Sequence, residues 1–580
     1  MEAILGSKII DSMRTDSEDS EPSLLHKEGV QVLPRDFVRR TGLNNPTRTA
    51  YICGDRQATW GQMHARSDLI AAVLLSKGLR VGDSVALLAP ECIEVYEHFF
   101  ACMKVGAIRV GVNRRFAHAE ILHVLKDSGA KFFFVHAACG DLSARLREDL
   151  KQLDITLIGF AGDHDFEEDM EALMNAVESV PDMPPLSSAD PLFYSYTSGT
   201  TGVPKGAVLT NGGTTITILH ALAEFGFVRD DRFFLPTGNA WVAVVLAFLG
   251  LGNGMTHVIA DGDYNRATFF DIVKEQAITT FLLAPTMLKW ALEDNKKTPF
   301  DLSSVRMIIY GSSPASPHLI QCVHEAFGKD MTNVYALTET TWGGVTFLSP
   351  DDHRRGLSEK PELLFSVGRV ASHFEISVRD EEGQSVDEGG AGEIWLRGPT
   401  LMTSYLNLPE QTQEVLKDGW LRTNDIGRVD EDGYLYLLDR KNFMIISGGV
   451  NVYPASVEAV LGKHPGLAAV CVIGLPHPEW GEAVVAVVRP SKSDQKICAD
   501  DLIEFCRDKL NRASTPKHIF FTDEEFPLTA NFKVRKNEVR DFLLTMPKSI
   551  PWDCEGGWRF QTPVQDNSFG KAANGSVGSG

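Results

Sequence analysis

Apolar residues recur in two alternating patterns over most of the chain. Residues 84–90 (SVALLAP) form a short continuous apolar run, which is typical of a buried strand. Residues 92–106 (CIEVYEHFFACMKVG) have apolar positions three or four apart and predict a helix that ends at its last residue, a glycine. A helix and a strand are predicted again at 121–129 and 131–135. This alternation predicts layered α/β structure with parallel sheets.

The pattern changes in the last third of the chain and predicts two domains. Around residues 380–440 turn-forming residues separate short strands, and residues 430–438 (DEDGYLYLL) predict a turn followed by a strand. A smaller unit with its own strands and helices follows. We therefore predict an α/β fold with a large multi-lobed domain of layered sheets and a β-rich subdomain at 34–439. A small mobile α+β domain is predicted at 443–547.

The two ends of the chain and its longest apolar run set further limits. Residues 1–33 are polar and charged, and residues 548–580 end in a Gly/Ser-rich stretch, so both are predicted to be disordered. The N-terminus lacks the long apolar core of a signal peptide. The apolar run from Trp241 (WVAVVLAFLGLG) predicts a buried core helix, because a bilayer span needs about 20 residues. No stable membrane insertion is expected.

Composition narrows the class of partner. The chain has 580 residues, and 77 acidic against 56 basic residues leave a formal charge of −21. This balance disfavours nucleic acid as a partner, because such binding needs basic residues that neutralise phosphates. The nine cysteines are scattered and form no CxxC pair. Neither a disulfide framework nor a zinc site is expected, and we predict a cytoplasmic protein with reduced thiols.

The densest local motif is residues 196–206 (YTSGTTGVPKG), between two strand-like segments. Its three glycines allow a ligand to approach the backbone, and its hydroxyls and lysine suit a phosphate. The alternative is a flexible surface turn. The motif is not a Walker A loop, because its lysine is followed by glycine rather than Ser or Thr. The candidate phosphate-binding residues are Thr197, Ser198, Gly199, Thr200, Thr201, Gly202 and Lys205.

This segment resembles the signature loop of the adenylate-forming superfamily, which includes acyl-CoA synthetases, adenylation domains and luciferases. Further motifs follow in the family's order from about residue 34 to 545. The resemblance implies ATP, Mg²⁺ and coenzyme A as cofactors. It also implies that 34–439 is an adenylating domain, and that the small domain turns about a hinge at 440–442, where Asn442 stands.

The segment 335–340 (YALTET) supplies a hydroxyl and a carboxylate just after a predicted strand. Glu339 has the oxygen ligands that Mg²⁺ prefers beside substrate phosphates, although an isolated glutamate is more often a solvated surface charge. Resemblance to the family's Tyr-Gly-x-Thr-Glu motif implies the metal role. It also implies that Thr338 lies near the α-phosphate and that Tyr335 and Ala336 contact the nucleotide, with Tyr335 beside the adenine. Gly311, Ser312 and Ser313 match the family's adenine-side loop, with an ordinary turn as the alternative.

Three further motifs carry candidate residues. Asp425 lies in TNDIG (423–427), and a carboxylate can accept both ribose hydroxyls. The family's pattern adds Arg440 to the ribose, with a surface salt bridge as the alternative. Lys533 matches the C-terminal catalytic lysine, which would stabilise negative charge. The resemblance therefore implies a catalytic set of Lys533, Glu339 and Thr200, and a coenzyme A loop at Ser447, Gly448 and Gly449.

Departures from the family pattern collect at the acyl site and the hinge. Asn239 stands where many relatives have a titratable His, and Asn442, Phe443 and Phe532 replace usual residues near the hinge and the catalytic lysine. No carboxylate follows Asn239, so an α-amino acid substrate is disfavoured, since its ammonium would be buried unpaired. The predicted acyl-site residues are Asn239, Trp241, Gly311, Trp342 and Gly343, with core packing as the alternative for the two tryptophans.

We therefore predict an ATP- and Mg²⁺-dependent acid–thiol ligase. A small-molecule carboxylic acid becomes acyl-AMP and is then joined to coenzyme A. One alternative passes the acyl group to a carrier protein's pantetheine or another nucleophile, and a second is a non-catalytic nucleotide- or acyl-binding relative. A homodimer is a further prediction.

Overall fold

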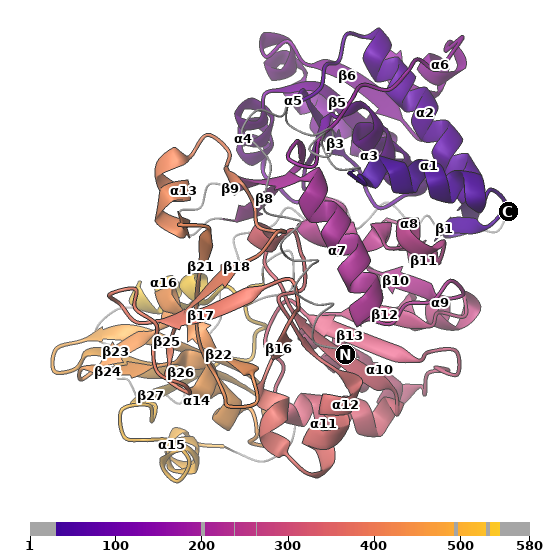
Figure 1. Cartoon of the computed structure of the whole chain (residues 1–580). Helices are drawn as coiled ribbons and strands as arrows, with labels where there is room; N and C mark the ends of the chain where they lie inside the picture. Colours follow the sequence, from indigo (N-terminus) through magenta and orange to yellow (C-terminus); the bar gives the residue numbers. More distant parts are fainter. Residues whose placement is uncertain are drawn as a thin grey trace, which may run out of the picture.

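The computed structural model describes residues 31–198, 204–236, 238–262, 264–491, 497–528 and 534–545 (Figure 1). Three sheets organise them, two in the large N-terminal part and one in the small C-terminal part. In Figure 1 the indigo and violet N-terminal lobe lies opposite the orange and yellow C-terminal elements. Of the two termini predicted to be disordered, 1–33 and 548–580, residues 1–30 and the whole of 548–580 lie outside the described residues.

The N-terminal lobe contains an eight-stranded sheet. Its central strands are parallel, and a β8–β9 hairpin follows them along the sheet. The predicted strands and helices at 84–90, 92–106, 121–129 and 131–135 are confirmed as β3 (Ser84–Leu88), α3 (Ile93–Val105), α4 (His118–Ser128) and β5 (Ala130–His136). The strand order is β19 (Ser404–Tyr405), β9 (Pro204–Thr210), β8 (Pro191–Ser198), β4 (Ile108–Gly111), β3 (Ser84–Leu88), β5 (Ala130–His136), β6 (Thr156–Phe160) and β7 (Glu168–Asp169).

Helices surround this sheet and shield its parallel strands, which need cover on both faces. Gly106 ends α3 in the left-handed conformation (φ +69°), as its place after the apolar helix predicts. The helices of this lobe are α1 (Pro34–Asn44), α2 (Trp60–Ser76), α3 (Ile93–Val105), α4 (His118–Ser128), α5 (Gly140–Gln152) and α6 (Met170–Asn175).

A fourteen-stranded sheet forms the rest of the large part. The parallel strands run from β1 (Thr49–Cys53), with β2 (Arg56–Thr59) at the edge, through β11 (Thr256–Ile259), β10 (Arg232–Leu235), β12 (Thr280–Leu283) and β13 (Met307–Gly311) to β14 (Asp330–Tyr335). The antiparallel strands continue with β15 (Thr346–Leu348), β16 (Gly368–Val370), β22 (Tyr434–Arg440), β21 (Trp420–Val429), β18 (Gly392–Arg397) and β17 (Glu375–Arg379), and β20 (Leu416–Lys417) pairs with β21. The predicted β-rich subdomain therefore extends a parallel sheet.

One buried cluster joins both sheets of the large part, from Val38 to Leu435. A second cluster lies against the parallel strands of the larger sheet, from Ile52 to Leu364. The helices over this sheet are α7 (Asn211–Glu224), α8 (Gly250–Asn253), α9 (Phe269–Glu275), α10 (Pro285–Lys297), α11 (Pro317–Phe327), α12 (Pro350–Ser358) and α13 (Pro409–Val415).

The apolar run that begins at Trp241 is buried and helical, as predicted, but it is divided into two short helices of different type. It forms the 3₁₀ helix η4 (Val242–Phe248) and then the short α8. Branched valines at 242, 244 and 245 disfavour the α conformation. At seven residues η4 is longer than most 3₁₀ helices, which rarely exceed about four residues.

The small C-terminal part has its own sheet and its own cores. The strands follow the order β24 (Val450–Val452), β23 (Ile445–Ser447), β26 (Gly481–Pro490) and β25 (Leu467–His477), with β27 (His518–Phe521) beside β26. Buried apolar clusters cover both faces of this sheet. Side chains of α14 (Pro454–Leu461), α15 (Ala499–Arg507) and α16 (Lys536–Leu544) contribute to these clusters. This is the α+β unit that the sequence predicts.

Thiol state and membrane insertion were also predicted from the sequence. The eight cysteines within the described residues are free thiols, and Cys554 lies outside them. Across the same residues, none of the helices combines the length and apolar character needed to cross a bilayer.

Buried His257 makes stability depend on pH. Its side chain is 1% exposed and its Nε2 accepts the Gly250 N–H at 2.9 Å, so the ring is neutral. Burial lowers its pKa from 6.5 to about 3. Below pH 6.5 the unfolded chain therefore binds a proton that the folded chain does not. The free energy of unfolding falls as the pH drops towards 3, by up to about 1.4 kcal/mol per unit.

We expect His257→Gln to flatten this acid slope. The amide keeps an acceptor for Gly250 but does not titrate. Urea unfolding measured at several pH values between about 4 and 7 checks the prediction. A slope equal to that of the unsubstituted chain would contradict it.

Candidate active site

The predicted phosphate loop is the tip of the β8–β9 hairpin. Thr197 pairs with Lys205 across the hairpin, so the two ends of the loop lie side by side. Outside contacts hold both strands: the Tyr196 hydroxyl donates to Asp127 Oδ2 at 2.8 Å, and His123 Nε2 lies 3.0 Å from the Pro204 carbonyl. The predicted Gly199, Thr200, Thr201 and Gly202 lie outside the described residues, as does the side chain of Ser198.

A distant segment runs beside this hairpin and brings Tyr405 to it. Strand β19 pairs with β9, and the Leu406 N–H donates to the Gly206 carbonyl at 2.8 Å. The Lys205 ammonium lies 5.8 Å from the centre of the Tyr405 ring. The Tyr405 hydroxyl donates to Glu339 Oε1 at 2.6 Å. Tyr405 therefore links the phosphate hairpin to the predicted metal ligand.

Glu339 lies in a short 3₁₀ turn, η5 (Thr338–Thr340), just after β14. The turn is fixed at two points: the Met402 N–H donates to the Glu339 carbonyl at 2.7 Å, and the Leu337 N–H donates to Thr340 Oγ1 at 3.2 Å. Burial, together with the Glu339 carboxylate, raises the pKa of Tyr405. A neutral Tyr405 donates a hydrogen bond to this carboxylate without adding a second negative charge beside it.

A second cluster joins Tyr335, Asp425 and Arg440. The Tyr335 hydroxyl donates to Asp425 Oδ2 at 2.6 Å, and Arg440 Nε donates to Asp425 Oδ1 at 3.1 Å. Asp425 and Arg440 are opposite each other on β21 and β22, and the Asp425 side chain is buried. Asp425 raises the pKa of Arg440, although burial opposes it. A carboxylate has about four acceptor sites, so these two bonds leave about two of them unused, as the predicted ribose role requires.

Gly311 ends β13, and Ser312 and Ser313 follow it at the same edge of the sheet. Gly311 pairs with Val334 on β14, and a Cβ on Gly311 would lie 2.5 Å from the Val334 carbonyl oxygen. Only glycine fits this close approach. Because the carboxyl ends of parallel strands meet at one edge, this loop and the segment Tyr335–Thr338 are neighbours. The predicted nucleotide residues on these two strands therefore come together.

Two predicted acyl-site residues lie in a strained turn after η5. Trp342 has φ +54° and is half-buried against the main core. Gly343 is buried, and a Cβ there would lie 2.6 Å from Thr400 Oγ1. Trp241 is half-buried at the start of η4. These positions are compatible with a pocket wall and also with packing.

Asn239 is buried, and its amide is used within the protein. Its Nδ2 donates to the Ala89 carbonyl at 3.2 Å, and its Oδ1 accepts from Arg109 Nη2 at 3.1 Å. The sequence predicted Asn239 as a hydrogen-bonding acyl-site residue. The structure directs these hydrogen bonds to Ala89 and Arg109.

The small domain holds the remaining candidates. Ser447, Gly448 and Gly449 form the turn between β23 and β24, where Gly448 (φ +59°) and Gly449 (φ +78°) have left-handed backbones. The Gly448 N–H donates to the Trp480 carbonyl at 2.8 Å, so the turn is held within the small domain. Lys533 and Phe532 lie outside the described residues.

The predicted hinge is a 3₁₀ turn, η7 (Lys441–Phe443), that contains Asn442. Lys441 Nζ donates to Glu393 Oε2 on β18 at 3.3 Å. Just before the turn, Asp439 Oδ2 accepts the Ala455 N–H of α14 at 2.8 Å. Lys536 Nζ lies 5.8 Å from the Phe443 ring. The turn is therefore contacted from both parts of the chain.

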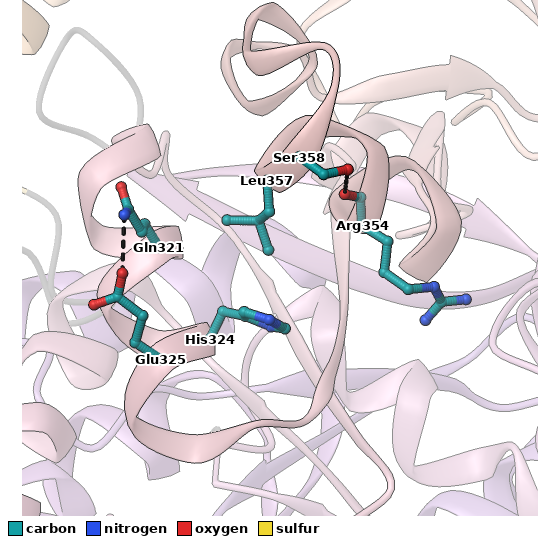
Figure 2. Close-up of a pocket in the computed structure, with 6 residues that line it drawn as sticks. All are labelled: Gln321, His324, Glu325, Arg354, Leu357 and Ser358. Atoms are coloured by element: carbon teal, nitrogen blue, oxygen red, sulfur yellow. Dashed lines mark hydrogen bonds between the residues drawn. The ribbon is translucent and has the colours of Figure 1, made fainter.

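A surface hollow of about 300 Å³ lies between α11 and α12, apart from these clusters (Figure 2). Figure 2 shows Gln321 and Glu325 hydrogen-bonded along α11, at 2.8 Å, across from Leu357. No predicted site residue lines the hollow. Its lining residues are Gln321, His324, Glu325, Arg354, Leu357 and Ser358.

Comparison with known proteins identifies the family. The sequence model described as AMP-binding enzyme matches residues 38–406. The model described as AMP-binding enzyme C-terminal domain matches residues 456–533. The chain belongs to the AMP-binding enzyme family. The AMP-binding enzyme described here therefore has the fold that the sequence resemblance implied.

Individual relatives of this AMP-binding enzyme are similar over nearly their whole length. It is 33% identical over 513 residues to the indoleacetate–CoA ligase of Aromatoleum aromaticum, covering 87% of this chain and 97% of the relative. It is 32% identical over 538 residues to a fatty acid–[acyl-carrier-protein] ligase, ScoC, of Streptomyces coeruleorubidus, covering 89% and 97%. The o-succinylbenzoate CoA synthetase of Bacillus subtilis, solved with an acyl-adenylate intermediate, superposes with TM-score 0.75 at 27% identity over 87% and 98% of the two chains.

Sequence reasoning missed two residues of this AMP-binding enzyme, Tyr405 and Arg109. Tyr405 is the aromatic residue of the segment MTSYLN (402–407), but nothing in the local sequence links it to Glu339. Arg109 was available as a basic residue inside an apolar strand, AIRVGV (107–112). A charge in such a strand is unusual, because burying it is costly without partners.

Proposed function

We propose that this enzyme activates a carboxylic acid whose acyl group is apolar or aromatic. The reaction is ATP-dependent acid–thiol ligation. A carboxylate oxygen attacks the α-phosphate, pyrophosphate leaves, and acyl-AMP forms. The thiol sulfur of coenzyme A then forms the C–S bond, the bond from the acyl carbon to AMP breaks, and the thiol proton passes to solvent.

The observation that carries this proposal is the cluster of Tyr335, Asp425 and Arg440. Asp425 has two acceptor sites left for the ribose hydroxyls, and Arg440 holds the carboxylate from the solvent side. The Tyr335 ring, at the end of β14, would lie against the adenine. Gly311, Ser312, Ser313 and Ala336 would complete the adenine side.

The phosphate end of ATP would lie at the β8–β9 hairpin. Thr197 and Lys205 at its base, with residues 198–202 between them, would hold the β- and γ-phosphates, and Thr338 would lie near the α-phosphate. Glu339 is a carboxylate beside this hairpin, a donor that fits Mg²⁺. When bound there, Mg²⁺ would neutralise phosphate charge.

The small domain would supply the remaining groups. Lys533 would stabilise negative charge on the attacking carboxylate and the bridging oxygen, with Thr200 on the phosphate side. Rotation about Asn442 would then bring Ser447, Gly448 and Gly449 to the coenzyme A arm. As part of this proposal we assign residues 34–439 to adenylation and 443–547 to the moving domain.

The acyl group would lie between Trp241, Trp342 and Gly343. The segment Ala240–Leu249 has no carboxylate that could pair with a substrate ammonium, which disfavours an α-amino acid. The protein partners of Asn239 use both of its amide protons and one of the two lone pairs of its Oδ1, so the amide offers no donor to a polar acyl group. This argues for an apolar acid.

Acid-dependent exchange of labelled pyrophosphate into ATP tests the proposal. We expect exchange with members of a panel of fatty, arylacetic and cinnamic acids, and acyl-CoA after coenzyme A is added. Amino acids serve as the negative control, for which we expect no exchange. No exchange with any acid of the panel would overturn the proposal.

The alternative acyl acceptor is the pantetheine of a carrier protein, and the name of one relative favours it. The similar ligase ScoC is named for transfer to an acyl carrier protein. Parallel reactions with free coenzyme A and with a pantetheine-bearing carrier protein distinguish the two. Rapid acyl-CoA formation excludes the carrier as the obligatory acceptor.

Tyr405→Phe is expected to weaken metal use. The substitution removes one hydrogen bond to Glu339 and keeps the ring beside Lys205. A hydrogen bond to a charged group contributes about 1.5–3 kcal/mol, so we expect a roughly tenfold higher Mg²⁺ concentration at half-maximal rate. Tyr436→Phe is the matched control, because Tyr436 donates to Asp430 at 3.0 Å on the neighbouring hairpin. Equal Mg²⁺ dependence in both variants would contradict the assignment.

The proposal also covers the cellular compartment and the oligomeric state of the enzyme. The free thiols of the described cysteines support a reducing compartment, and we assign the enzyme to the cytoplasm. The homodimer remains a prediction.

A further inference from the structure

Arg109 is a buried cation in the strand β4 of the eight-stranded sheet. Its side chain is 1% exposed, and among the described residues its guanidinium hydrogen-bonds to neutral oxygens of Asn239 rather than to a carboxylate. The guanidinium lies 4.9 Å from the centre of the Phe99 ring. A buried charge is costly unless polar groups compensate it. The partners of Arg109 therefore indicate what the residue is for.

Both partners are oxygens of one residue, Asn239. Arg109 Nη1 donates to the Asn239 carbonyl at 2.6 Å, and Nη2 donates to Asn239 Oδ1 at 3.1 Å. A guanidinium is planar and rigid, so two parallel bonds fix the orientation of what it holds. Arg109 therefore fixes both the backbone and the amide of Asn239.

The opposite side of the Asn239 amide is fixed as well. Its Nδ2 donates to the carbonyls of Ala89 at 3.2 Å and Pro90 at 3.5 Å, in the segment after β3. Asn239 follows β10 of the larger sheet, whereas Arg109, Ala89 and Pro90 belong to the eight-stranded sheet and its loops. The contact therefore joins the two sheets at the start of the acyl segment.

Gly111 provides the space for this contact. A Cβ on Gly111 would lie 2.6 Å from Arg109 Nη1 and 2.7 Å from the Cα of Ala240. No side chain fits there without moving the backbone of Ala240. Strand β4 therefore supplies both the arginine and the gap through which it reaches Asn239.

Glu91 adds a negative group to the same interior. It is buried, and its Oε2 accepts the Tyr96 hydroxyl at 2.8 Å. Burial raises its pKa to about 7, while hydrogen bonds from Tyr96 and Asn239 and the charge of Arg109 oppose the rise. The polar network of Arg109, Asn239, Glu91 and Tyr96 lies among apolar core residues.

We propose that Arg109 is a positioning residue for acyl-substrate specificity. Acting through Asn239, it holds Ala240 and Trp241 in place against the eight-stranded sheet and gives the acyl pocket a rigid wall. A rigid wall selects acids by the shape of the acyl group, because a misfitting group cannot displace it. This inference rests on the proposed function, and specifically on the acyl role of the segment that begins at Asn239.

Arg109→Met and Arg109→Lys test it in steady-state assays with the acid panel. Methionine keeps much of the length of the arginine side chain but loses both hydrogen bonds to Asn239. Lysine keeps the positive charge and can donate to one of the two Asn239 oxygens. We expect the KM for the preferred acid to rise about tenfold or more with methionine and less with lysine. The differences in kcat/KM between short, long and aromatic acids should become smaller. The KM for ATP should change by less than about twofold.

Arg306→Met is the matched control. Arg306 donates to Asp231 with two nitrogens, at 2.8 and 2.7 Å, and so holds the opposite end of β10. This variant should lower the melting temperature without changing the KM for the acid. A role of Arg109 in folding alone would give both variants the same kinetic profile.

A double-mutant cycle separates positioning from general destabilisation. Asn239→Ala should reproduce the loss of selectivity, and Arg109→Lys combined with Asn239→Ala should add little to it, because both act through one contact. Additive effects, or unchanged acid KM and selectivity in Arg109→Met, would overturn the inference. If that variant does not fold, the lysine and alanine variants decide the question. Absence of acid-dependent exchange in the unsubstituted enzyme would instead refute the proposed function.

Discussion

Replacing Lys533 with alanine lowers acid-dependent pyrophosphate exchange by roughly 10²–10³-fold. The expected loss matches the removal of one group that stabilises developing negative charge in a transition state. The proposed role of Lys533 belongs to adenylation. The variant should therefore still convert added acyl-AMP and coenzyme A to the thioester. Single-turnover measurements of each half-reaction check the two expectations separately.

Lys509→Ala is the control for this experiment. Lys509 is an exposed lysine of the same domain, whose ammonium lies 3.8 Å from the centre of the Phe505 ring. Both half-reactions should proceed normally in that variant. Unchanged exchange in Lys533→Ala would remove this lysine from the mechanism. Equal loss in both half-reactions would assign it a role other than the one proposed.

Asp425→Asn raises the KM for ATP by about 10- to 100-fold. The amide loses the charge that Arg440 faces, and it replaces one acceptor oxygen with a donor that opposes either the ribose or the Tyr335 hydroxyl. Hydrogen bonds to a charged group contribute about 1.5–3 kcal/mol, which sets this range. Initial rates at varied ATP and saturating acid measure it.

Asp430→Asn provides the comparison. Asp430 also accepts a tyrosine hydroxyl, from Tyr436 at 3.0 Å, but it lies in the turn between β21 and β22, away from the cluster. Loss of this carboxylate should affect stability and leave the KM for ATP unchanged. If Asp425→Asn behaves in the same way, Asp425 is structural and the ribose assignment is wrong.

Elements with strong local patterns were predictable. The strand at 84–90 and the helix at 92–106 are recognised by their continuous and three-to-four periodic apolar positions, and both are present. The run from Trp241 was predictable as a buried helix but not in its division into the 3₁₀ helix η4 and the short α8, because apolar residues indicate burial and do not distinguish the two helix types.

The nucleotide cluster was predictable residue by residue, through motifs. Tyr335, Asp425 and Arg440 each stood in a segment that resembles the family. Their mutual hydrogen bonds span 90 residues between Tyr335 and Asp425. The pairing of β21 with β22 and the path of β14 bring these residues together.

The sequence by itself determined the class of fold, the family and the identity of most candidate residues, because periodicity and short motifs are local properties of the chain. Only the tertiary structure decided which groups face one another. Tyr405 meets Glu339 because β19 pairs with β9, and Arg109 reaches Asn239 because Gly111 leaves room for it. Such contacts depend on strand pairing and on the space left between packed segments. Neither quantity is recorded within any single stretch of the sequence.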